Sequence, residues 1–360
     1  MTDRGGGSAP AGQPVLRIRD LVVEFDTPDG VVRAVDGVSY DVAAGETLGV
    51  VGESGCGKTV TVLAVLGLLP RRSARVVRGE ALLGGMDLLR LPPRRLRAVR
   101  GKRVAMVFQN PMTSLHPALT VRHQIAEALR AHDRGLPRHA ARRRAVELLD
   151  AVGVADAARR ARGYPHQWSG GMRQRAMIAM AIANEPDLLI ADEPTTALDV
   201  TIQAQVLDLL REVRGRTGAA TILITHDLGV IAEMADRVVV VYAGRVVETG
   251  DVHTIFHAPR HPYTLGLLAA LPRLDTDRQS LAAIPGQPPD LVRRPSGCAF
   301  HPRCGLHRGR NRCVAQSPDL ATVGPGHRAA CHYADELAAE TARAAGMSAA
   351  EPGDGPGAPA

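Results

Sequence analysis

Short runs of apolar residues alternate along this chain with longer stretches in which apolar residues recur at helical spacing. Five runs have the continuous apolar character of buried strands, the last as the start of a closing hairpin: residues 47–51, 104–108, 187–191, 221–225 and 238–242. Residues 111–165 have a helical pattern, and residues 16–42 contain short strand-like runs split by Asp-Gly turns, which predict antiparallel hairpins. Strands that alternate with helices predict an α/β fold with a parallel sheet.

The ends of the chain differ in composition from the part between them. Residues 1–13 are Gly-rich and residues 336–360 are rich in Ala, Gly, Pro and Glu, so we expect both segments to be disordered. After residue 250 the Pro, His and Cys content rises and the periodicity fades. We therefore expect a main domain over residues 14–250 and a smaller one over residues 251–335.

Charge and hydropathy narrow the class of protein. The 360 residues carry a net charge of +7, which permits contact with nucleic acid or an anionic membrane. The arginines nevertheless cluster without interleaved aromatic residues, which fits solvated helix faces better. No apolar run approaches the roughly 20 residues that span a bilayer, and residues 1–14 lack the apolar stretch of a secretory signal. We expect a soluble, cytoplasmic chain.

The most specific motif is a glycine-rich segment between the apolar run 47–51 and a helical pattern. It consists of Gly52, Glu53, Ser54, Gly55, Cys56, Gly57, Lys58 and Thr59. Glycines allow successive backbone N–H groups to surround an anion, and the following helix adds unpaired N–H groups and the positive end of its dipole. Lys58 would reach the outer phosphates of a nucleotide, and Thr59 would bind Mg²⁺. Only two of the 44 basic residues are lysines, so a Lys at this position is not expected by chance.

Two carboxylates and a histidine follow later strand-like runs. Asp192 and Glu193 end the run 187–191, and His226 ends the run 221–225, at the edge where α/β folds place ligand chemistry. Asp192 suits a partner of Mg²⁺, and Glu193 suits a base that deprotonates an attacking water. His226 is placed to contact the γ-phosphate. Together with the phosphate loop, these residues predict ATP hydrolysis.

Further motifs complete a known pattern. They are Gln109, the segment Ser169, Gly170, Gly171 and Met172, and the segment that ends in Asp199. Together with the phosphate loop, Asp192, Glu193 and His226, they occur in the order and approximate spacing of an ABC-transporter ATPase subunit. The chain resembles this family from residue 16 to about residue 250. The resemblance implies a P-loop NTPase: a RecA-like core with an antiparallel β subdomain, a helical subdomain over about 111–172, and here a small Cys-containing C-terminal domain.

The resemblance also implies roles for these motifs. In the family, two subunits enclose ATP between the phosphate loop of one and the signature of the other, here residues 169–172, with Asp199 in the D-loop. Gln109 helps to bind Mg²⁺ and senses the membrane subunit. An aromatic residue near the N-terminus stacks on adenine, and Phe25 is the best candidate; the alternative is a core Phe in a hairpin. Trp168 stands where the family usually has Leu, and we expect it to pack in the helical subdomain.

Residues 109–117, 164–175, 199–205 and 261–264 resemble the oligopeptide/dipeptide importer branch. The branch implies a heterodimer with a second ATPase, because Met172 and residues 176–181 resemble the D-type subunit. It also implies two integral membrane permeases, an extracytoplasmic substrate-binding protein, and a peripheral position on the cytoplasmic face of the membrane. Three alternatives stay open: import of nickel or another small solute, a soluble ABC ATPase that acts on nucleic acid or ribosomes, and ATP binding without hydrolysis.

Four of the five cysteines crowd one C-terminal segment: Cys298, Cys304, Cys313 and Cys331. Disulfides are rare in the cytoplasm, so a metal site is the better interpretation. The C-x₂-C pairing of zinc knuckles is absent, and four thiols suit a [4Fe–4S] cluster, which some peptide-importer ATPases with a similar segment hold. Zinc and free thiols stay open. Cys56 lies at a helix N-terminus, a position that can lower the pKa of a thiol, although simple filling of space is the preferred interpretation.

Overall fold

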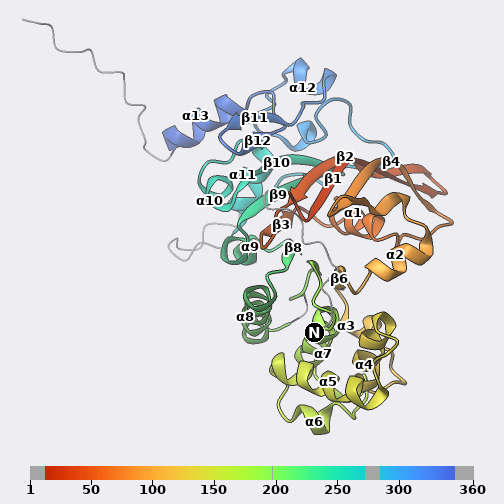
Figure 1. Cartoon of the computed structure of the whole chain (residues 1–360). Helices are drawn as coiled ribbons and strands as arrows, with labels where there is room; N and C mark the ends of the chain where they lie inside the picture. The colour runs from red at the N-terminus through yellow and green to blue at the C-terminus, as the bar shows by residue number, and fades with distance from the viewer. Residues whose placement is uncertain (1–12, 197, 272–283, 345–360) are drawn as a thin grey trace, which may run out of the picture.

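The computed structural model describes residues 13–196, 198–271 and 284–344 (Figure 1). Its larger sheet has eight strands in the order β11-β12-β10-β9-β3-β8-β7-β6. They are β3 (Thr47–Val51), β6 (Val104–Val107), β7 (Leu188–Asp192), β8 (Ala220–Ile224), β9 (Arg237–Tyr242), β10 (Arg245–Asp251), β11 (Ala321–Gly324) and β12 (His327–Ala329). Every residue of β3, β7 and β8 is buried, because a parallel sheet covered on both faces favours continuous apolar runs. All five predicted runs are confirmed as strands.

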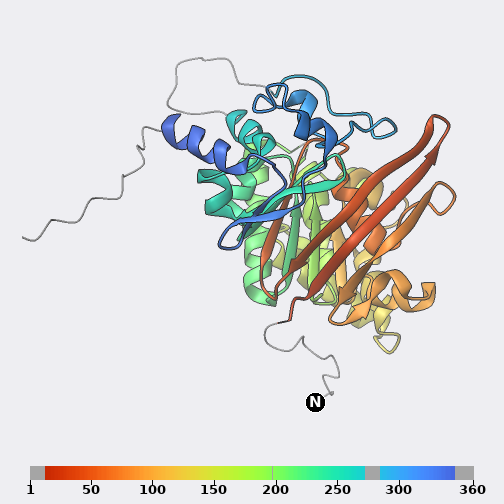
Figure 2. The ribbon, with the colours of Figure 1, turned by 90° about the horizontal axis from the view of Figure 1, so that it is seen from above.

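The second sheet is antiparallel, with the order β2-β1-β4-β5. Its strands are β1 (Leu16–Thr27), β2 (Gly30–Val42), β4 (Ala74–Leu83) and β5 (Met86–Asp87). The long β1–β2 hairpin is prominent in Figure 2. It confirms the predicted hairpin, whose turn closes with Gly30 at φ 129°, a conformation that favours glycine. Strand β4 has no such signal in the sequence, and its Val76 and Val77 are exposed.

Helices cover the sheets and build a separate lobe. The lobe consists of α3 (Pro111–Ser114), α4 (Val121–His132), α5 (Arg138–Ala151), α6 (Ala157–Arg160), η2 (Pro165–Gln167) and α7 (Gly170–Ile182). The other helices are α1 (Lys58–Val65), η1 (Leu88–Arg90), α2 (Pro93–Val99), α8 (Val200–Thr217), α9 (Leu228–Met234), α10 (Val252–His257), α11 (Pro262–Ala269), η3 (His301–Arg303), α12 (Asn311–Ala315) and α13 (Ala334–Ala344). Within the described residues, no helix has the length and apolar character to cross a membrane.

The lobe of α4 to α7 lies at one end of the molecule in Figure 1, and the C-terminal helices α12 and α13 lie at the other. Trp168 is 4% exposed and belongs to a large cluster of buried apolar side chains that includes those of this lobe. Its expected packing role is therefore confirmed, since burying an aromatic ring removes a large apolar area from water.

The C-terminal segment, by which we mean the chain from residue 251 on, is not detached from the main sheet. Strand β12 pairs with β10 through Glu248 with Ala329 and Thr249 with Arg328. The expected disorder of residues 336–360 is wrong for residues 336–344, which belong to α13; residues 1–12 and 345–360 lie outside the described residues. The Ala-rich sequence of α13 has high helix propensity, and Leu337 is buried at 4% exposure. Composition alone therefore misled the prediction.

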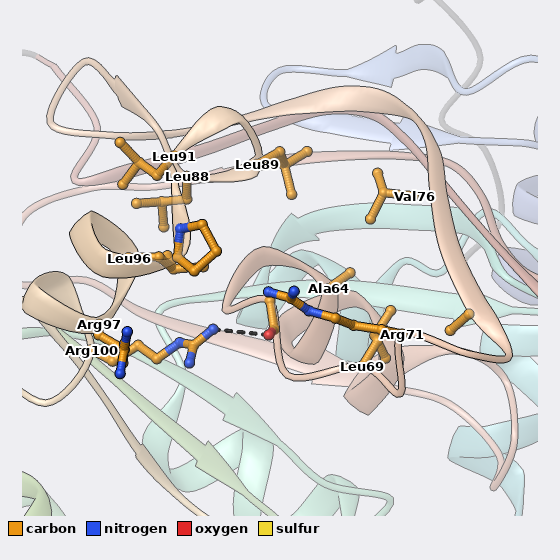
Figure 3. Close-up of a pocket in the computed structure, with 13 residues that line it drawn as sticks. Ala64, Leu69, Arg71, Val76, Leu88, Leu89, Leu91, Leu96, Arg97 and Arg100 are labelled. Carbon is orange, nitrogen blue, oxygen red and sulfur yellow. Dashed lines mark hydrogen bonds between the residues drawn. The ribbon is translucent and has the colours of Figure 1, made fainter.

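A groove of about 530 Å³ lies between the end of α1, strand β4 and helix α2 (Figure 3). Leucines line one side, and Arg71, Arg97 and Arg100 supply positive charge. Arg100 is held in place because its guanidinium donates to the carbonyl oxygens of Leu66, at 2.6 Å, and Gly67, at 2.8 Å. None of the predicted site residues lines this groove, so the site is built elsewhere.

The buried His261 predicts a pH-dependent stability. Burial lowers the pKa of His261 from 6.5 to about 4, against the opposing charge of Glu248. Below pH 6.5 the unfolded chain binds a proton here that the folded chain does not bind until about pH 4, so stability falls as the pH drops through this window. We expect the free energy of unfolding of the wild-type chain to fall by about 2 kcal/mol more than that of His261→Asn between pH 7 and pH 5. Denaturant unfolding at the two pH values measures this difference.

The variant is a matched one, because His261 Nδ1 accepts from the backbone N–H of Tyr263 at the start of α11, and Asn is also a good cap. Equal losses of stability in the two proteins between these pH values would contradict the prediction.

Candidate active site

The phosphate loop connects β3 with α1. Gly52 has φ 151° and Gly57 has φ 101°, and both are closely packed. A Cβ atom would lie 2.1 Å from the carbonyl oxygen of Val241 at Gly52 and 2.4 Å from that of Ala34 at Gly57. These positions therefore require glycine. Helix α1 begins at Lys58 without a side-chain cap, so its first N–H groups face the loop, as an anion site needs.

Lys58 is buried inside the loop that it follows. Its Nζ donates to the carbonyl oxygens of Gly52 at 2.6 Å and Glu53 at 3.0 Å. These bonds hold the ammonium beside the loop amides, where it can exchange carbonyl partners for phosphate oxygens. Cys56 is also buried; burial raises the pKa of its thiol, although Lys58 opposes the shift. A lowered thiol pKa is therefore wrong, and the preferred interpretation of Cys56 as a small residue that fills space is confirmed.

Thr59 and Asp192 meet across the end of the sheet. The Thr59 hydroxyl donates to Asp192 Oδ1 at 2.9 Å, and Asp192 is 3% exposed at the end of β7. Burial raises the pKa of Asp192, an effect that the Thr59 hydrogen bond opposes. An adjacent hydroxyl and carboxylate are oxygen ligands of the kind that Mg²⁺ prefers. The two residues therefore fit the predicted magnesium site.

Three side chains, from the loops that follow β6, β7 and β8, contact the carboxylate of Glu193. Its Oε2 accepts from Gln109 Nε2 at 2.7 Å and from Thr196 Oγ1 at 2.8 Å, and its Oε1 lies 3.3 Å from His226 Nδ1. Burial raises the pKa of this carboxyl, but hydrogen bonds from Thr196 and His226 outweigh it and the net shift is downward. The carboxylate is therefore ionised at neutral pH, as a base that accepts a proton from water must be.

The parallel sheet explains this convergence. Strands β6, β7 and β8 are parallel neighbours, so the residues that follow each of them lie at one edge. Gln109, Glu193 and His226 were predicted as site residues, and the structure brings them together. Thr196 was missed, because no sequence pattern distinguishes its hydroxyl from that of Thr195. Glu193 has φ 46°, an uncommon conformation for a residue with a side chain, and such conformations cluster at functional sites.

The predicted signature lies apart from the phosphate loop. Ser169 caps α7, and its Oγ accepts from the backbone N–H of Met172 at 3.4 Å. Asp199 caps α8, with Oδ1 2.9 Å from the backbone nitrogen of Ile202. Among the described residues, no hydrogen bond or ion pair joins these segments to the phosphate loop. Phe25 lies half-buried on β1, against the core of the antiparallel sheet. Their contacts with ATP stay predictions.

The four C-terminal cysteines do converge. Cys298, Cys304, Cys313 and Cys331 line one cavity of about 20 Å³, and none is in a disulfide. Burial raises the pKa of Cys298 to about 11 and that of Cys331 to about 12. In the part of the chain that the structure describes, however, no group of three or more His, Cys, Asp or Glu residues is arranged to hold a metal ion. The convergence fits a shared site, whereas the predicted iron–sulfur cluster lacks support from ligand geometry.

A phosphate loop, a Thr59–Asp192 pair and an ionised Glu193 at the C-terminal edge of a parallel sheet define the class of this protein. It is a P-loop ATPase.

The chain is similar to known proteins over most of its length. A family model described as ABC transporter matches residues 35–196, and one described as oligopeptide/dipeptide transporter, C-terminal region, matches residues 247–313. Dipeptide transport ATP-binding protein DppD of Escherichia coli is 50% identical, over 89% of this chain and 96% of that protein. DppD of Bacillus subtilis is 52% identical, over 81% and 87%. The ATP-binding cassette MJ0796, a dimer bound to ADP and phosphate, matches with a TM-score of 0.60 and 26% identity, over 66% of this chain and 98% of that one.

The chain therefore belongs to the ABC transporter ATPases, in the branch of the oligopeptide/dipeptide transporter ATP-binding proteins. This confirms the predicted family, together with the P-loop fold and ATP hydrolysis.

Proposed function

We propose that this chain is the ATP-hydrolysing subunit that drives import of dipeptides or oligopeptides across the cytoplasmic membrane. The observation that carries the proposal is the convergence of Gln109, Thr196 and His226 on Glu193, beside the Thr59–Asp192 pair. Similarity to DppD proteins and to the C-terminal region of oligopeptide/dipeptide transporters supports the choice of peptides as cargo.

The residues divide the chemistry between them. The loop amides and Lys58 would bind the phosphates; Thr59 and Asp192 would hold Mg²⁺, which would supply neutralising charge. Glu193 would accept the proton of the attacking water, and His226, whose Nδ1 lies 3.3 Å from Glu193 Oε1, would contact the γ-phosphate. Gln109 lies on the same carboxylate, so a movement of its loop alters the base directly.

We further propose that the working unit is a dimer with a second, different ATPase, docked on two membrane permeases that receive peptide from an extracytoplasmic binding protein. The signature at the start of α7 would complete the partner's ATP site, because Ser169 and the Gly170 and Gly171 amides offer donors there. A groove of about 330 Å³ supports permease docking. It lies between β6 and α7, beside the Gln109 loop, and its lining includes Leu68 and Phe108, both 40% exposed.

Uptake of labelled dipeptides and oligopeptides, with nickel measured alongside, tests the function. Cells would carry either the wild-type chain or Glu193→Gln. Loss of peptide uptake only with the variant supports the proposal. Loss of nickel uptake instead would change the cargo, and unchanged uptake of every solute would contradict the proposed function. Co-purification of integral membrane proteins would separate an importer subunit from an ABC ATPase that acts on nucleic acid or ribosomes.

We propose that the four clustered thiols hold a [4Fe–4S] cluster, because cysteines from separate segments line one cavity and four thiolates are the ligand set of such a cluster. The cavity must widen to admit it. Protein purified without oxygen is expected to contain iron and sulfide, and Cys331→Ser to lose both. Cys56→Ser is the control, since Cys56 lies in the phosphate loop. Wild-type protein with zinc alone, or with neither metal nor sulfide, would contradict the cluster.

A further inference from the structure

The C-terminal segment reaches the phosphate loop through one arginine. Arg303 Nη1 donates to Glu53 Oε2 at 2.7 Å, and Nη2 donates to Glu53 Oε1 at 2.9 Å. Glu53 is the second residue of the loop, and Arg303 ends η3, 250 positions later. Two parallel N–H···O bonds between a guanidinium and a carboxylate fix both distance and orientation. The pair therefore sets where this part of the loop lies.

The arginine is itself held rigidly. Its side chain is 5% exposed, and its Nε donates to the carbonyl oxygen of Pro285 at 2.9 Å. The guanidinium carbon lies 5.9 Å from the ring centre of Tyr242 and 6.0 Å from that of Phe300. The hydrogen bonds to Glu53 raise the pKa of Arg303, against the effect of burial. A charged group fixed on several sides can restrain the loop without losing much rotamer freedom.

A second residue of the segment holds the backbone at the same point. The hydroxyl of Tyr263, a fully buried residue on α11, accepts from the backbone N–H of Glu53 at 2.7 Å. The carbonyl oxygen of Glu53 accepts from Lys58 Nζ at 3.0 Å. A displacement of Glu53 would therefore move a partner of the lysine that binds phosphate.

We propose that Arg303 is a positioning residue for ATP: by clamping Glu53 it keeps the phosphate loop in its binding conformation, and the C-terminal segment thereby sets the affinity for nucleotide. The proposal rests on the proposed ATPase function. Arg303 precedes Cys304 and lies five residues after Cys298, so the segment that carries these thiols is the one that restrains the loop. A displacement of the residues that carry the thiols would therefore also displace Arg303 and, through Glu53, the phosphate loop.

Three variants test the clamp: Arg303→Met, which keeps the apolar stem, Arg303→Lys, which keeps the charge without the fork, and Glu53→Gln. The matched control is Arg310→Met. Arg310 also pairs with a carboxylate, Glu336 at 2.7 Å, and packs on a ring, Tyr333 at 4.1 Å, but these partners belong to the C-terminal segment. We expect Arg303→Met to raise the Kd and KM for MgATP about tenfold with kcat changed less than threefold, and Arg303→Lys to recover only part of the loss.

The double variant Arg303→Met with Glu53→Gln decides the mechanism. If the two residues act as a pair, the double variant binds ATP no more weakly than the worse single variant. Additive losses, or an unchanged Kd with kcat reduced in proportion to the folded fraction, would overturn the clamp. Binding of ATP by wild-type protein that does not hydrolyse it would refute the proposed function and leave the clamp testable by Kd alone.

Discussion

Glu193→Gln is expected to lower ATP hydrolysis by about 10²- to 10⁴-fold, the usual contribution of general base catalysis, while ATP still binds. The amide has nearly the shape of the carboxylate and keeps an oxygen to accept from Gln109 and Thr196. It cannot accept the proton of the attacking water. Phosphate release per subunit measures the first effect, and equilibrium binding of labelled ATP measures the second.

In the proposed dimer, closure would precede hydrolysis and hydrolysis would open it, so the same variant is expected to accumulate an ATP-bound dimer. Light scattering with MgATP, on the chain alone and with the proposed partner ATPase, would detect it. Glu185→Gln is a closely matched control, since Glu185 is an exposed glutamate with φ 49°, against 46° for Glu193, so any backbone strain is shared. Turnover by Glu193→Gln within a few-fold of the Glu185→Gln rate would contradict the assignment of the base.

Much of the site was predictable because its parts are local in sequence. Each buried strand appears as an apolar run, and the polar residue at its end is read directly: Asp192 is the last residue of β7, and His226 comes shortly after β8. The rule that parallel strands share an edge then predicts that such residues meet. The helical subdomain was predicted from the helical periodicity of residues 111–165. The packing of Trp168 within it was predicted from the large apolar area of the ring.

Contacts between distant segments could not be predicted in this way. The Arg303–Glu53 pair spans 250 positions, and nothing in the composition of either segment distinguishes this arginine from the many others. The convergence of Cys298 and Cys331 likewise depends on how η3, α12 and the end of β12 return to the sheet. Such long-range pairings are set by tertiary packing, which the period of a local pattern does not contain.

Lys58→Ala is expected to weaken ATP binding by about 10- to 100-fold, because a charged hydrogen bond contributes about 1.5–3 kcal/mol and each 1.4 kcal/mol is tenfold in Kd. Turnover at saturating ATP is expected to fall further, since charge grows on the transferred group in the transition state. Fluorescence titration with a labelled ATP analogue and phosphate release measure the two effects. Thermal unfolding adds a third readout, because ligand at 100 times its Kd stabilises a protein by about 2.7 kcal/mol and the variant should lose most of that gain.

The chain offers a natural control for this substitution. Lys102, the other lysine, is exposed in the turn before β6, so Lys102→Ala removes the same group away from the nucleotide. Lys58 is buried, with Nζ donating to the Gly52 and Glu53 carbonyl oxygens, so its loss also leaves two acceptors of the loop without that donor. Unfolding without nucleotide therefore has to be compared between the two variants first. If Lys58→Ala folds like Lys102→Ala and still binds ATP with wild-type affinity, the loop does not hold phosphate through Lys58. The positioning role of Glu53 would then have to act through the loop amides alone.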